Sequence, residues 1–493
     1  MPRVSRKVTP TEQRREFLKR FGITASATLF GGACTGGTTM TEATNSPVVS
    51  PQIAGIDPKN IVDEFKARDL GSLSDAALYR KTGEIVSRPP QKGLTSFTLH
   101  APLEVMSRYG LIRLVSQSER ELARMQMVTS AAVYGARVNP LASPASIKPF
   151  PNLSAAAKEF SRTFRQGDPN GLEALVLQIA AQFGTASLVH LLTPLALPTL
   201  TGASHSHIGL WLLLRHGESA GIEDASLLRA AARALAADPT GQMKSFSGMS
   251  IVGGQPLQKT PSEIEQEILE KLANPPKGTL GGQSIRALVE AGERTGNADA
   301  LFGELIHHDL TGEQIDAAFR AILRVCAHSM LQDDIKQAKF GWTHCLTLPQ
   351  SACGLSSLNT DRKLALAAAF VWITAYRSVL SSRAIDFAWT PSKAPDASVH
   401  EALHTSPEVA AARVWHAEET EIPEIRIALA TQASIRNDIH LVKYTRATFD
   451  MGSFDPGFTK LYLAAAAYLC ALWIKECPRD TLLDNLLDGR TTP

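Results

Sequence analysis

The feature that most constrains the fold is an apolar run near the end of the chain. The segment Leu461–Ile474 reads LYLAAAAYLCALWI and is apolar on nearly every side of a helix, which is typical of a helix buried all round. Its 14 residues are too few to span a bilayer. Other elements must therefore surround this helix, and a chain of 493 residues can bury a core of that size.

The stretch Ile435–Asp450, IRNDIHLVKYTRATFD, leads into this run. Read as one helix, it places His440 and Lys443 on the same face, because positions three apart are neighbours, and it places an apolar stripe beside them at Ile435, Ile439 and Val442. A charged lysine at such a buried edge costs several kcal/mol, so it must pair, lose its proton or do chemistry. The alternative is a Lys443 that snorkels outward and a His440 that is hydrogen-bonded in the core.

The remaining pattern predicts an all-α fold, a large multi-helix bundle. Helical periodicity starts near Asn60 and recurs along the chain, whereas alternating β-branched segments joined by hairpin dipeptides are absent. Thr260 and Thr311 begin capping-box patterns before two of the helices. No fixed-period repeat supports a solenoid. We expect one helical domain over residues 57–490 with a loop-rich insertion at about 238–283.

The first 34 residues resemble a twin-arginine export signal. Arg14 and Arg15 precede a mildly apolar region, Phe21–Ala33. This predicts a periplasmic protein, exported folded by the twin-arginine machinery with its cofactor already loaded, and joined to the signal by a flexible linker over 35–56. Cys34 could instead be a lipid-anchoring site. The net charge of +2 gives no electrostatic case for nucleic acid, and no integral membrane segment is expected in the mature protein.

The cysteines do not suggest a metal site. Past Cys34 the chain has cysteines at 326, 345, 353, 470 and 477, an odd number without paired metal-ligand spacing. We interpret them as mostly buried thiols, and leave open whether one disulfide forms.

Four of the 13 histidines lie in mainly apolar segments at the starts or middles of predicted helices: His100, His205, His344 and His440. A helical bundle can project such side chains from separate helices onto one cofactor. Each of them alone is more often a hydrogen-bonded core histidine than a ligand.

These histidine segments resemble those of the questin oxidase-like family. The matching stretches are HAPLEVMSRYG after His100, SHSHIGLWLLLRHG around His205, THCLTLPQSA with His344 followed by Thr347, and DIHLVKYTRATFD followed by DPGFTKLYLAAAAYL. The likeness comes as islands over roughly 95–475, and the last island is the most specific. The export signal, the 238–283 region and the extra His207 depart from the pattern.

The resemblance implies an α-helical oxygenase that opens an aromatic polyketide ring, an anthraquinone in the namesake reaction, described as Baeyer–Villiger-like with NADPH as external reductant. No G-x-G-x-x-G follows a strand, so a metal is the simpler source of oxygen chemistry. Our hypothesis is that Fe(II) binds O2 and directs it at a phenolate-bearing aromatic substrate. It would be held by His100, His205, His344, His440 and a carbamylated Lys443, with Lys443 and His440 as catalytic residues and Asp438 or Thr347 supporting the imidazoles.

Two other function classes remain open. His400, Glu401 and His404 form an HExxH, the zinc-peptidase motif, with a third ligand available from His416, Glu418 or Glu419. Against it, the motif lies between Pro395 and Pro407, which leaves little more than two helical turns. The second alternative is a non-enzymatic helical protein that binds haem or a hydrophobic molecule, with a pocket lined by His307, His308 and the six tryptophans Trp211, Trp342, Trp372, Trp389, Trp415 and Trp473.

Overall fold

The structure is a computed structural model. It describes residues 53–91, 96–139, 147–200, 205–217, 226–237, 243, 254–279, 284–294, 297–357, 362–392, 396–482 and 484. The predicted export signal, Cys34 and most of the predicted linker lie outside these residues. Ile53 and Ile56, which the sequence placed in the linker, are buried at 3% and 5% exposure.

The described residues are almost entirely helical and contain only isolated β-bridges, which agrees with the predicted all-α class. The helices of the N-terminal half are α2 Ile61–Ala67, α3 Asp75–Val86, α4 Ser96–Leu111, α5 Arg120–Gly135, α6 Leu153–Gln166, α7 Pro169–Phe183, α8 Thr185–Ala196, α9 His205–Gly217 and α10 Ser226–Ala237. Those of the C-terminal half are α11 Pro261–Ala273, α12 Ile285–Arg294, α13 Asn297–His307, α14 Gly312–Gln332, α15 Thr343–Ser356, α16 Arg362–Leu380, α17 Val399–Leu403, α18 Pro407–Trp415, α19 Ile422–Ile435, α20 Ile439–Phe454 and α21 Thr459–Glu476.

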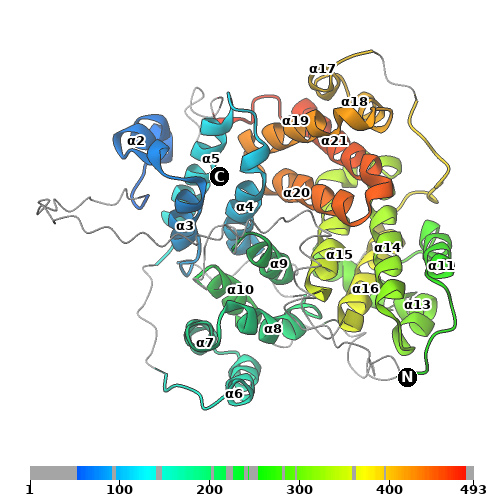
Figure 1. Ribbon diagram of the computed structural model, residues 1–493, viewed down its shortest axis with the longest axis horizontal. Helices are drawn as coiled ribbons and strands as arrows, with labels where there is room; N and C mark the ends of the chain where they lie inside the picture. The colour runs from blue at the N-terminus through cyan, green and yellow to red at the C-terminus, as the bar shows by residue number, and fades with distance from the viewer. Residues whose placement is uncertain are drawn as a thin grey trace, which may run out of the picture.

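Helix α21 is the central buried helix that the sequence predicted. Every residue of Leu461–Ile474 is buried, and α14, α17, α18, α19 and α20 pack around it (Figure 1). The helix is longer than the apolar run. Together with the short 3-10 helix that precedes it, α21 covers Pro456–Glu476. This segment and helix α16 are both long and apolar enough to cross a membrane, but 78% and 83% of their most apolar windows are buried. A core helix of this kind satisfies the same criterion as a membrane span.

Local signals set several helix starts as predicted. The Thr260 hydroxyl accepts from the backbone N–H of Glu263, and the Glu263 carboxylate accepts from the backbone N–H of Thr260. The two bonds form a complete capping box at the start of α11. Thr311 and Gln314 repeat this arrangement at α14. One prediction was wrong, because Ile435 ends α19 and the chain breaks at Arg436–Asp438 before α20 begins. The stretch is therefore two helices, and Asp438 caps the second.

Four helices, α4, α9, α15 and α20, pack against one another as a bundle: α4 on α9 and α20, and α15 on α9 and α20 (Figure 1). Their later turns are linked by a buried network around Asp450 of α20. Arg215 of α9 donates to Asp450 at 3.1 Å, Gln350 of α15 donates to it at 3.3 Å, and Arg446 donates to the Gly110 carbonyl of α4 at 3.1 Å. Since these residues follow the predicted histidines or Lys443 on each helix, all four N-termini point to the same end.

Candidate functional site

The five residues that the sequence singled out meet at the N-terminal end of this bundle. His205 is the first residue of α9, while His344 and His440 are the second residues of α15 and α20. His100 lies in the second turn of α4 and Lys443 in the second turn of α20. Residues far apart in the chain are thus brought together because each sits near the start of a helix that points to one centre.

Lys443 is at the middle of this group, which we call the histidine–lysine cluster (His100, His205, His344, His440 and Lys443). Its Nζ lies 3.2 Å from His205 Nε2 and 2.9 Å from His344 Nε2, and these two Nε2 atoms are 3.2 Å apart. The rings of His100 and His440 lie beside these residues and complete the group. His100 is 4.9 Å from the His205 ring and 5.2 Å from the His440 ring, centroid to centroid.

Burial disfavours the charged forms of His100, His344, His440 and Lys443. Burial, then the nearby Lys443 and His440, lower the pKa of His100 to about 3. The pKa of His344 is also well below its ordinary value, for the same main reason. Burial lowers the pKa of Lys443 to about 7, against an opposing contribution from Asp438. Near neutral pH His100, His344 and His440 are therefore neutral, and the Lys443 amine has a substantial deprotonated fraction. These are the forms that bind metals or act as nucleophiles.

Backbone and side-chain contacts orient two of the imidazoles. His344 Nδ1 lies 2.6 Å from the Phe340 carbonyl, so the proton of the neutral ring is on Nδ1 and the Nε2 lone pair faces the cluster. His440 Nδ1 lies 3.5 Å from Asp438 Oδ1, a charge contact longer than a good hydrogen bond. Burial raises the pKa of Asp438, but its contacts with His440 and the Leu441 N–H outweigh this effect and lower it overall.

A hydrogen bond to the protein core also holds the start of α15 in place. Pro349 has no N–H, so the carbonyl of Cys345, four residues earlier, lacks its helical partner. The buried Cys326 thiol of α14 donates to that carbonyl at 3.1 Å. This contact ties the residue after His344 to the core. All five described cysteines are free, so no disulfide forms among them.

One further contact of the cluster was not predicted. Residues Ala338–Trp342 form a π-helical turn directly before α15, and the ring of Phe340 in this turn lies 4.9 Å from the ring of His440. The carbonyl of Phe340 also accepts from His344 Nδ1, so this one residue contacts two members of the cluster. Turns of this kind follow no simple residue pattern, so nothing in the sequence predicted this contact.

Other predicted residues lie outside the histidine–lysine cluster. Thr347 is buried, but its hydroxyl makes no hydrogen bond within the part of the chain that the structure describes. His207 is buried against Trp372, with ring centroids 6.3 Å apart. Trp211, Trp342 and Trp372 are fully buried side chains of the core.

The HExxH motif does not form a zinc-peptidase site. Helix α17 ends at Leu403, and His400 and His404 lie on the exposed surface. The Glu401 carboxylate accepts from the backbone N–H and hydroxyl of Ser398, both at 2.8 Å. Glu401 thus caps the helix instead of facing a water bound by the histidines. His416, a possible third ligand, contacts the Pro391 carbonyl at 2.9 Å.

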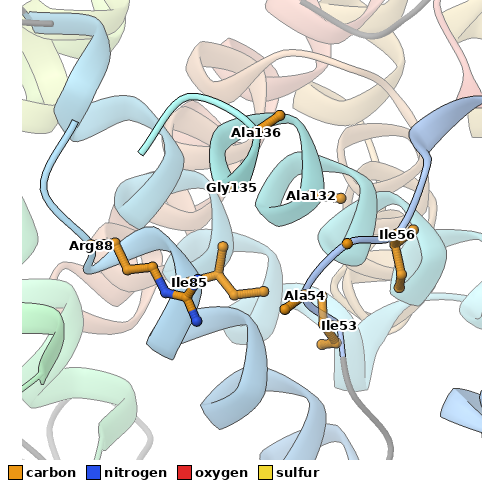
Figure 2. A pocket seen from close by; sticks show the side chains of 9 residues that line it. Ile53, Ala54, Ile56, Ile85, Arg88, Ala132, Gly135 and Ala136 are labelled. Carbon is orange, nitrogen blue, oxygen red and sulfur yellow. The ribbon is translucent and has the colours of Figure 1, made fainter. Parts of the chain in front are cut away.

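A small cavity of about 120 Å³ lies elsewhere, against α5 (Figure 2). Residues 53–56, Ile85, Ala132 and Gly135 line it, and Arg88 is the one charged side chain on its wall. No member of the histidine–lysine cluster contributes to it.

The chain matches no protein-family model, no curated protein and no solved structure. A function for it therefore has to be argued from the histidine–lysine cluster itself.

Proposed function

We propose that the protein is an oxidoreductase, a non-haem iron oxygenase that uses O2 to cleave an aromatic ring of the phenol or anthraquinone type. The observation that carries the proposal is the position of Lys443 Nζ between the Nε2 atoms of His205 and His344, at 3.2 and 2.9 Å. The questin oxidase-like resemblance of the four histidine segments supplies the reaction class.

Two of the nitrogen donors are spaced like ligands of one divalent transition metal ion. With metal–nitrogen bonds of about 2.1 Å, two donors on one ion lie about 3.0 to 3.4 Å apart. The Nε2 atoms of His205 and His344 are 3.2 Å apart. Among the described residues, however, no three His, Cys, Asp or Glu side chains alone are arranged to hold an ion. The histidines converge on a lysine, so the proposed site needs Lys443 as a ligand.

Carbamylation would make Lys443 that ligand. The neutral Lys443 amine attacks the carbon of CO2, an N–C bond forms, one C=O bond opens to the C–O⁻ of the carbamate, and the proton of the amine is released to water. The product is an anionic oxygen donor, which would offset the charge of the metal where four neutral imidazoles cannot. The four helix N-termini carry partial positive charge and favour an anion at this point.

In this proposal His100, His205, His344, His440 and carbamylated Lys443 hold Fe(II). Bound there, iron would supply the reaction of O2 with the electron-rich ring. The residues of the chain would bind the metal and the substrate and orient them. The Phe340 carbonyl fixes the tautomer of His344, Asp438 faces His440, and the helix N-termini favour a phenolate. Oxygen uptake with and without NADPH would decide whether an external reductant is consumed.

Elemental analysis of protein purified without chelator tests the proposal. We expect about one iron per chain in the wild type, lost in His440→Ala and retained in His404→Ala, because only His440 belongs to the ligand set. His404→Ala is the matched control, since it removes an exposed imidazole. Zinc lost in His404→Ala would refute the proposal in favour of a peptidase. A Soret band without non-haem iron would instead indicate a haem-binding protein.

A further inference from the structure

The π-helical turn Ala338–Trp342 holds one large side chain out of the core. Ala338, Gly341 and Trp342 are buried, and Trp342 is fully so. Lys339 is engaged as well, because its Nζ pairs with Glu476 and lies 4.5 Å from the centre of the Trp473 ring. Phe340 alone in this turn is exposed, at 59%.

Close packing fixes the position of the turn. A Cβ on Gly341 would lie 2.8 Å from Leu380 Cδ1 and 3.3 Å from Gln337 Cβ, so the turn packs closely against α16 at this residue. The Thr343 hydroxyl donates to the Lys339 carbonyl at 2.7 Å. The Phe340 ring is therefore exposed to solvent on a turn whose neighbouring residues are packed or hydrogen-bonded on both sides.

Phe340 touches two members of the histidine–lysine cluster. Its ring meets the His440 ring edge to face, with centroids 4.9 Å apart and planes at 83°. Its carbonyl accepts from His344 Nδ1 at 2.6 Å. A single exposed apolar side chain is ordinary on a protein surface. What distinguishes Phe340 is that its exposed ring stands directly beside His440.

We infer that Phe340 is the aromatic surface on which the substrate stacks. The inference rests on the proposed function and specifies its substrate class, a planar aromatic anion. Aromatic rings prefer offset-stacked or edge-to-face neighbours, and the exposed Phe340 ring offers such a neighbour to a planar molecule. The converging helix N-termini add an attraction for negative charge at the same end of the bundle. A phenolate on a fused ring system satisfies both features, whereas a saturated carboxylate satisfies only the second.

Anaerobic absorbance titration with 1,8-dihydroxyanthraquinone tests this role on the full-length protein purified without chelator. Phe340→Ala is expected to weaken binding about tenfold, and Phe340→Tyr to stay within about threefold of the wild type, because the tyrosine restores the ring. Phe458→Ala is the matched control, since Phe458 is also exposed, at 40%, but lies on the turn before α21. It should bind as the wild type does. Cyclohexanecarboxylate, a saturated anion, should displace the anthraquinone with the same affinity from wild type and from Phe340→Ala.

The stacking role is overturned if Phe340→Ala binds the anthraquinone like the wild type, or if Phe458→Ala weakens binding as much. Iron measured in the same samples separates the two proposals. If the wild type contains iron and Phe340→Ala binds the anthraquinone as tightly as the wild type does, only the stacking role is refuted. Wild type without iron, but with binding lost in Phe340→Ala, would refute the oxygenase and leave Phe340 as the contact of an aromatic-binding site.

Discussion

Lys443→Met is expected to abolish iron binding and oxygen consumption together. Methionine nearly matches the length of lysine but cannot form a carbamate, and Nζ is the atom within 3.2 Å of both His205 and His344. We expect iron to fall from about one ion per chain to below about a tenth of that. Elemental analysis and an oxygen electrode measure the two losses. With ¹³C-bicarbonate, a carbamate carbon signal should appear in the wild type and be absent from the variant.

The stability of the metal-free variant separates loss of function from misfolding. Burial lowers the pKa of Lys443 from 10.5 to about 7, so between these pH values the unfolded chain binds more protons than the folded one. Wild-type stability should rise with pH across this window, and Lys443→Met should lack that contribution. The variant should unfold at a higher temperature at pH 7 or below. A folded variant that keeps both iron and turnover would contradict the carbamate ligand.

Asp333→Ala is expected to destabilise the protein by about 3 to 5 kcal/mol, since removing one partner leaves a buried charge uncompensated. Asp333 and Arg377 form an ion pair in which neither side chain is exposed. Arg377 also donates to the carbonyls of Ala273 at 2.8 Å and Arg383 at 3.0 Å, which joins the end of α11 to α16. Urea unfolding followed by circular dichroism measures the loss.

Two comparisons test the cause of that loss. The double variant Asp333→Leu and Arg377→Met should recover much of the stability, because it removes both charges and leaves apolar side chains in their place. Glu159→Ala breaks the exposed pair with Arg162 on α6 and should change stability little. If Asp333→Ala behaves like Glu159→Ala, the buried pair does not hold these helices together.

Much of the fold could be predicted because its signals are local. Thr260 with Glu263, and Ser406 before Pro407, mark helix starts within four residues. The apolar run at Leu461–Ile474 is buried because every face of it avoids water. The histidine–lysine cluster could be anticipated for a related reason, since a histidine or lysine within an apolar helix must have a partner inside.

The remaining features depend on contacts between distant segments. Asp438 is a local signal for the start of α20, but the break at Arg436–Asp438 is also held by a distant contact, in which Arg436 donates to the Cys477 carbonyl at 3.1 Å. The π-turn that places Phe340 beside His440 depends on close packing against Leu380. The role of Glu401 as a helix cap, by contrast, could be predicted from a local pattern. Ser398, just before the HExxH motif, lies three residues before Glu401, and the two form a capping box.

The shared direction of α4, α9, α15 and α20 has a consequence for assembly. Neighbouring helices that run the same way cannot be joined by short turns, so the chain must return along the bundle between them, and contacting site residues lie 99 to 238 positions apart. Such a high contact order means that the site closes late, after α20 has been synthesised and docked. A metal ion bound there would report that nearly the whole chain has folded. A transport route that accepts folded proteins, as the predicted twin-arginine signal implies, would let that loading finish before export.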